Sequence, residues 1–111
     1  MHQVLIEHRE GTALVLASGE LDAFAAPDLA AAFAGVADTS SVVADLTRVS
    51  FMDSTALGEI VRAARARDEL GAALRIVLPG GPARRIFEIT ALDRALPVAE
   101  SRLAALAELA P

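Results

Sequence analysis

The chain has 111 residues, a formal charge of −5, no cysteine, and ten basic residues that are all arginine. This length predicts one domain over residues 1–111, and the missing cysteines exclude disulfides and cysteine metal sites. The acidic balance argues against binding to nucleic acid or to an anionic membrane. The apolar runs are too short for membrane insertion and the opening residues do not resemble a secretory signal, so we expect a cytoplasmic protein.

The first third of the sequence predicts a β-hairpin followed by a helix. Residues 3–10 and 12–20 are rich in Val, Leu and Ile, and Gly11 between them can take the positive φ of a tight turn. In the next segment Pro27 suits the first turn of a helix and Gly35 suits its end.

The middle of the sequence predicts a buried strand and a long helix. The nearly unbroken apolar run at residues 41–46 is typical of a strand that is covered on both faces. A helix should follow from about Ser54 to Leu70. Its predicted apolar stripe is Leu57, Ile60, Val61 and Ala64. Its predicted solvated charges include Glu59, Arg62, Arg65 and Arg67.

The last third predicts a strand at residues 73–79 and a helix beginning near Pro82, then a short strand within residues 95–101 and a final helix over residues 101–109. The expected core residues of the helix after Pro82 are Ile86, Phe87 and Ile89. The complete order is ββαβαβαβα. It predicts an α/β domain whose mixed sheet combines an N-terminal hairpin with parallel βαβ strands, packed with about four helices.

The triplet Asp53-Ser54-Thr55 lies where the central strand ends and the long helix begins. Ser, Thr and Asp are the preferred N-cap residues, because their side-chain oxygens accept hydrogen bonds from free amides of the first turn. If Ser54 is the cap, Thr55 is the first helical residue and its hydroxyl can point outward. Ligand chemistry in open α/β sheets collects at this edge, and a helix N-terminus tolerates an added phosphate.

A catalytic use of these hydroxyls lacks supporting residues. The chain has no G-x-S-x-G elbow, and neither His2 nor His8 is placed by sequence to act as a base for Ser54 or Thr55. The two histidines are not accompanied by a carboxylate cluster, so they do not predict a metal site. We therefore expect a protein that is not an enzyme and that needs no cofactor or metal.

Three motifs, in the right order, resemble those of a STAS domain as found in bacterial anti-sigma-factor antagonists, and the resemblance extends over essentially the whole chain. They are "GELD" at residues 19–22, "FMDSTAL" at residues 51–57 and "RRIFEITALD" at residues 84–93. The family pattern at the second motif is roughly hxDSSGL opening a helix. The resemblance implies the STAS fold and a role in regulating transcription by partner switching.

The resemblance also implies a site and its partners. Thr55 matches the family's phosphoacceptor, with Ser54 as the alternative, and Asp22 matches the acid of the loop beside the acceptor. The implied partner is an anti-sigma factor that is also a serine/threonine kinase, with a metal-dependent serine/threonine phosphatase resetting the switch. The expected partner-binding residues are Asp22, Asp53, Ser54, Ala56 and Glu59. We expect the protein itself to be a monomer or a weak dimer.

Two departures from the family pattern leave an alternative open. Thr55 stands where the best-known antagonists carry Ser, and Ala56 replaces the usual Gly. Ala favours helix over Gly by up to about 1 kcal/mol, and its methyl group could obstruct a kinase active site. The alternative function is a STAS docking subunit that is not phosphorylated, in a lipid-transport ATPase or a stress-signalling scaffold.

Overall fold

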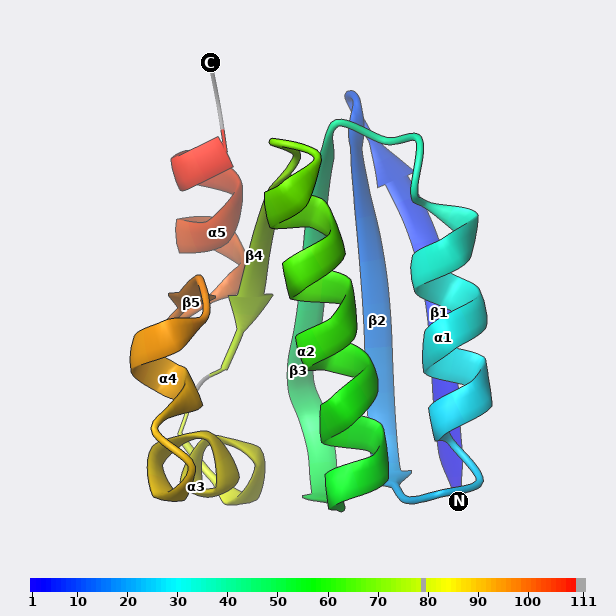
Figure 1. The fold of residues 1–111 in the computed structure, drawn as a ribbon, viewed down its shortest axis with the longest axis vertical. Coiled ribbons are helices and arrows are strands. Elements are labelled where there is room, and N and C mark those ends of the chain that lie inside the picture. Colours follow the sequence, from blue (N-terminus) through cyan, green and yellow to red (C-terminus); the bar gives the residue numbers. More distant parts are fainter. Residues whose placement is uncertain (79, 110–111) are drawn as a thin grey trace.

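A computed structural model of the chain describes residues 1–78 and 80–109. These residues form five strands and five helices around one mixed sheet (Figure 1). The strand order is β1-β2-β3-β4-β5, in which β1 is antiparallel to β2 and all other neighbours are parallel. The predicted α/β fold, with a hairpin followed by parallel crossovers, is confirmed.

The strands are β1 (His2–Arg9), β2 (Thr12–Leu21), β3 (Ser41–Met52), β4 (Ala73–Val77) and β5 (Val98–Ala99). The hairpin turn between β1 and β2 has positive φ at both central residues, 48° at Glu10 and 85° at Gly11. Such a turn matches the right-handed twist of the two strands. The predicted end of β4 at Pro79 lies outside the described residues.

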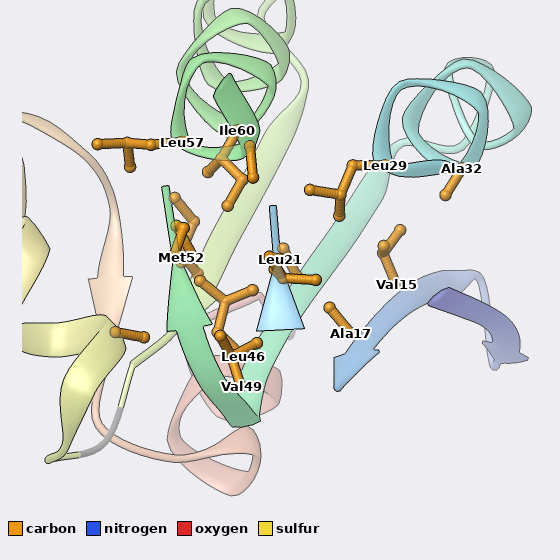
Figure 2. Packing of buried hydrophobic residues seen from close by; sticks show 14 of the residues in the cluster. Val15, Ala17, Leu21, Leu29, Ala32, Leu46, Val49, Met52, Leu57 and Ile60 are labelled. Carbon is orange, nitrogen blue, oxygen red and sulfur yellow. The ribbon is translucent and has the colours of Figure 1, made fainter. Parts of the chain in front are cut away.

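The helices are α1 (Ala26–Gly35), α2 (Ser54–Glu69), α3 (Pro82–Ile89), α4 (Leu92–Ala95) and α5 (Arg102–Leu109). Helices α1, α2 and α3 bury residues in the larger hydrophobic cluster, whereas α5 contributes to a second cluster. Figure 2 shows α1 and α2 on one side of the sheet and part of the α5 segment on the other. Among the described residues, no helix combines the length and the apolar character that crossing a bilayer requires.

Strand β3 is the centre of the core. Val42 and Ala44 belong to the larger cluster and Val43 to the second one, and all three are at most 1% exposed. Since successive side chains of a strand point to opposite faces, this division confirms that the strand is covered on both sides.

Strand β3 is six residues longer at its C-terminal end than the predicted 41–46 segment. Exposed Thr47, Arg48 and Ser50 made this part of the sequence look like a loop. Val49 and Met52 nevertheless enter the core, and the strand stays paired with β2 through two register shifts. Such bulges let a strand continue while the exposure of its side chains becomes irregular.

Helix α3 and the segment after it also differ from the prediction. The one-turn helix α4 was not predicted, because four residues are too few to show helical periodicity. Ile89, expected in the core, is 76% exposed. Phe87 and Ala83, one turn apart, form the buried face of α3, and Ile89 lies well away from that face around the helix.

Arg67 was expected among the solvated charges of α2 but is only 6% exposed. Its Nε donates to the carbonyl of Ala73 at 3.0 Å and its Nη2 to the carbonyl of Thr39 at 2.6 Å. Burial lowers the pKa of Arg67. Arg67 follows the buried Ala64 by three residues, so the helical period places both side chains on the same inward face of α2.

A second buried charge attaches α5 to the sheet. Asp45 of β3 is 5% exposed and forms a salt bridge with Arg102, with Nη2 to Oδ2 at 2.8 Å. Its Oδ1 accepts hydrogen bonds from both the amide and the hydroxyl of Thr47. Burial by itself would raise the pKa of Asp45, but the Thr47 hydrogen bonds and Arg102 together hold that pKa below its ordinary value of 3.8.

We predict that Asp45→Asn lowers the free energy of unfolding by about 1.5–3 kcal/mol at pH 7, as expected for losing hydrogen bonds to a charged group. A lowered pKa adds stability that is complete above the unfolded-state pKa and is lost as the pH falls through the folded-state pKa. The difference between wild type and variant in urea unfolding should therefore be constant from pH 7 to about pH 5 and shrink below pH 4. A difference that stays constant down to pH 3 would contradict this.

Candidate functional site

The first and second motifs meet at one edge of the sheet because they end two adjacent parallel strands. Leu21 ends β2 and Met52 ends β3, and the two residues are paired in the sheet. The amide of Asp53 donates a hydrogen bond to the carbonyl of Leu21 at 3.0 Å. The loop after β2 and the start of α2 therefore begin side by side, at the lower edge of the sheet in Figure 1.

Asp53 is the N-cap of α2. Its backbone is extended, and its Oδ1 accepts hydrogen bonds from the amides of Thr55 and Ala56, both at 3.0 Å. The alternative in which Ser54 is the cap is wrong: Ser54 and Thr55 are the first two helical residues. One carboxylate oxygen satisfies two of the four free amides that every helix N-terminus leaves.

The two hydroxyl residues are presented to solvent. Ser54 and Thr55 are both exposed, and their hydroxyls form no hydrogen bond with any other described residue. They lie at the N-terminal end of a 16-residue helix, where the partial positive charge of the helix dipole is concentrated. The structure thus brings an accessible hydroxyl pair to an end of α2 that favours negative charge.

Asp22 organises the neighbouring turn in the same way as Asp53. Its Oδ1 accepts hydrogen bonds from the amides of Phe24 at 3.0 Å and Ala25 at 3.2 Å, and its carbonyl accepts from the amides of Ala25 and Ala26. The side chain of Ala25 is fully buried, whereas that of Phe24 is 85% exposed. Phe24 was missed in the sequence, although a phenylalanine within a turn of small and polar residues was a visible signal.

Ala56 and Glu59 differ from the other predicted partner residues. The Ala56 side chain is 0% exposed and belongs to the core, so its methyl group does not lie on the surface where a partner would meet it. A direct contact with Ala56 is therefore not supported. The Glu59 side chain is 14% exposed and forms a salt bridge with Arg62. Glu59 was expected to be solvated, but only a small part of its side chain is accessible to solvent or to a partner.

Gly19 of the first motif is required by the conformation of the local backbone. Gly19 has a φ of +80°, and a Cβ placed on it would lie 2.1 Å from the carbonyl oxygen of Met1. The amide of Glu20 donates to that same carbonyl at 3.2 Å. Only glycine combines this backbone conformation with such a close approach of the chain.

No group of three or more His, Cys, Asp or Glu residues that could hold a metal ion occurs within residues 1–78 and 80–109. His2 instead contacts Asp28 of α1, with Nε2 to Oδ2 at 2.6 Å, and His8 is exposed on β1.

We predict that Gly19→Ala destabilises the protein more than Gly11→Ala. Both residues have positive φ, which costs about 1–2 kcal/mol for a side chain with a Cβ. At Gly11 nothing lies within 4 Å of the added atom, whereas at Gly19 the Met1 carbonyl must move. Urea unfolding of both variants would measure the difference, and equal losses would contradict a close approach at Gly19.

We also predict that Asp53→Ala lowers the free energy of unfolding by about 1 kcal/mol, because two amides of α2 lose their acceptor. Asp53→Ser is the matched control, since serine is also a good N-cap and should recover most of the loss. Chemical denaturation gives both values. A loss as large for Ser as for Ala would contradict the capping role.

Comparison with known families and structures agrees with this geometry. The STAS domain family model matches residues 3–105. The crystal structure of an anti-sigma factor antagonist from Mycobacterium paratuberculosis is similar to this chain with a TM-score of 0.86 and 31% sequence identity, covering 98% of this chain and 94% of that chain. No curated protein gives a significant match.

Two further solved structures share the fold at 20% identity. A candidate anti-sigma factor antagonist from Thermotoga maritima has a TM-score of 0.83 and covers 96% of this chain and 93% of its own. The phosphorylated form of SpoIIAA, a cell fate determinant of Bacillus, has a TM-score of 0.74 and covers 97% of this chain and 100% of its own. The motifs, the topology and the family match lead to one conclusion: this chain belongs to the STAS domain family.

Proposed function

We propose that this protein is an anti-sigma factor antagonist that works by partner switching in the cytoplasm. Its unmodified form binds an anti-sigma factor that is also a serine/threonine kinase, and phosphorylation of Thr55 by that kinase ends the binding. A metal-dependent serine/threonine phosphatase restores the binding form. In this scheme the protein is a ligand and a phosphorylation substrate, and it catalyses no reaction itself.

The observation that carries the proposal is the exposed Thr55 hydroxyl at the second position of α2. The similarity to solved anti-sigma factor antagonists supports the general role. Thr55 is preferred over Ser54 because it matches the family's acceptor position, and Ser54 remains the alternative acceptor.

The capped helix also explains why a phosphate would act on the partner more than on the fold. The amides of Thr55 and Ala56 already donate to Asp53, so a phosphate on Thr55 gains little from them. It would add about −1.5 to −2 charges to a solvent-facing position near the positive end of the helix dipole. The fold would keep its stability, while a partner surface in contact with Thr55 would have to desolvate the added charge.

The contact surface in this proposal is centred on Ser54 and Thr55. Asp53 precedes them and Asp22 follows the paired strand β2, and each already uses one carboxylate oxygen to hold two backbone amides. The second oxygen of each carboxylate can accept a hydrogen bond from the partner. Glu59 lies one turn further along α2 and contributes at the rim.

We predict that wild type gains one phosphate when incubated with ATP and its cognate anti-sigma kinase, and that Thr55→Ala gains none. Intact mass measures this directly, with Ser54→Ala as the matched control that should still be modified. Phosphate on Thr55→Ala but not on Ser54→Ala would move the acceptor to Ser54.

Binding should depend on charge at the same position. Thr55→Ala should bind the kinase with wild-type affinity, whereas Thr55→Glu should bind at least about tenfold more weakly, which is about 1.4 kcal/mol. Thr55→Gln has the same shape as Glu without its charge and should keep most of the affinity. Equal Kd values for the Glu and Gln variants would rule out the charge switch.

The alternative function predicts a different pattern in the same experiments. An unphosphorylated docking subunit of a lipid-transport ATPase or stress-signalling scaffold would bind its partner stably and gain no phosphate from any kinase. Ala56, where the family carries glycine, was the reason for this alternative, but its methyl group is buried in the core and does not obstruct a kinase.

A further inference from the structure

Phe24 is the most exposed aromatic side chain among the described residues. Phe24 is 85% exposed, compared with 48% for Phe51 and 0% for Phe87. Removing a phenylalanine side chain from water is worth about 1.5–3 kcal/mol. At Phe24 almost none of this free energy is used by the fold, so it remains available to a partner.

The backbone around Phe24 is held in place. Asp22 accepts two hydrogen bonds on its side chain and two on its carbonyl within this turn. The next residue, Ala25, is 0% exposed and fixes the turn to the core, and Ala26 begins α1. The turn therefore presents the phenyl ring from a fixed base, so binding pays little backbone entropy for ordering it.

Phe24 and the phosphoacceptor can be covered by one partner surface. The carbonyl of Leu21 and the amide of Asp53 are 3.0 Å apart. Phe24 is three residues beyond Leu21, and Thr55 is two residues beyond Asp53. Even a fully extended chain keeps their Cα atoms within about 23 Å of each other. One side of a standard interface is about 800 Å², or about 30 Å across, so a single partner can cover both residues.

We propose that Phe24 is an apolar anchor for the protein that binds at Thr55, and that it helps to determine which kinase is recognised. This inference rests on the proposed function. The partner it fits is an anti-sigma kinase with an apolar pocket beside its phosphotransfer site. Aromatic side chains that fill such pockets are common hot spots of protein interfaces. Thr55 supplies the switch, whereas Phe24 supplies affinity that does not depend on charge.

This division of roles has a kinetic consequence. A phenyl ring takes no part in phosphoryl transfer, so Phe24 should stabilise the bound ground state and the transition state equally. Losing it should raise KM for phosphorylation of Thr55 and leave kcat unchanged. It should also weaken binding equally at low and at high salt, because burial of a phenyl ring is not screened. The penalty of Thr55→Glu should shrink with salt.

The experiment compares Phe24→Ala with wild type in Kd and in phosphorylation kinetics, with the cognate anti-sigma kinase, at low and high salt. We expect Kd and KM to rise about tenfold to a hundredfold at both salt concentrations with kcat unchanged. Phe24→Leu should lose less, because it keeps an apolar side chain. Leu70→Ala is the matched control: Leu70 is 75% exposed but lies at the far end of α2, so its removal should change nothing.

The outcomes separate the two proposals. If wild type binds the kinase and Phe24→Ala binds it with the same Kd, Phe24 is not an anchor, but the proposed function still stands. The anchor role would also be overturned if the loss of affinity in Phe24→Ala became smaller at high salt, or if the variant lowered kcat. Failure of wild type to bind any anti-sigma kinase would overturn both. Phe24 is exposed, so its replacement should leave the melting temperature unchanged, and a melting curve of the variant checks that its fold is intact.

Discussion

The parallel pairing of β2 with β3 is the constraint on which the rest of the structure depends. It brings the ends of both strands to one edge and sets Leu21 against Met52 in the register. The hydrogen bond from Asp53 to Leu21 continues this contact beyond the sheet. Because β3 is buried on both faces, the pairing cannot slip by one residue without turning its apolar side chains away from their clusters. The position of the hydroxyl pair is therefore as fixed as the core.

Three acidic residues, Asp22, Asp45 and Asp53, have structural roles. Asp22 and Asp53 each use one oxygen to hold two amides, and the buried Asp45 attaches α5. The groups left free at the edge include the hydroxyls of Ser54 and Thr55 and the ring of Phe24. A surface of this kind can bind while the hydroxyl is neutral and can be altered by a single added charge. The acids of the motifs then make the local backbone rigid enough to present it.

The opposite end of the sheet is closed by Arg67. Its guanidinium joins the loop before β3 to the start of β4 through two carbonyls, and it has no carboxylate partner within residues 1–78 and 80–109. The buried arginine thus holds together two chain segments that are far apart in the sequence. Arg67 lies in the last turn of α2, so this contact is at the other end of the helix from Thr55.

The sequence by itself determined the order of the strands and of the helices apart from α4, the two-sided burial of the central strand and the hydroxyl pair at the start of α2, because local periodicity and capping preferences carry that information. It placed Thr55 at a helix start but could not decide which residue caps it, since Asp53 and Ser54 both suit the position. Only the tertiary structure decided what depends on distant segments. The pairing with β2 extends β3 to Met52, the core encloses Ala56, and the carbonyls of Thr39 and Ala73 accept hydrogen bonds from Arg67. The exposure of Phe24 was decided in the same way, by a turn whose shape depends on burying its neighbour Ala25.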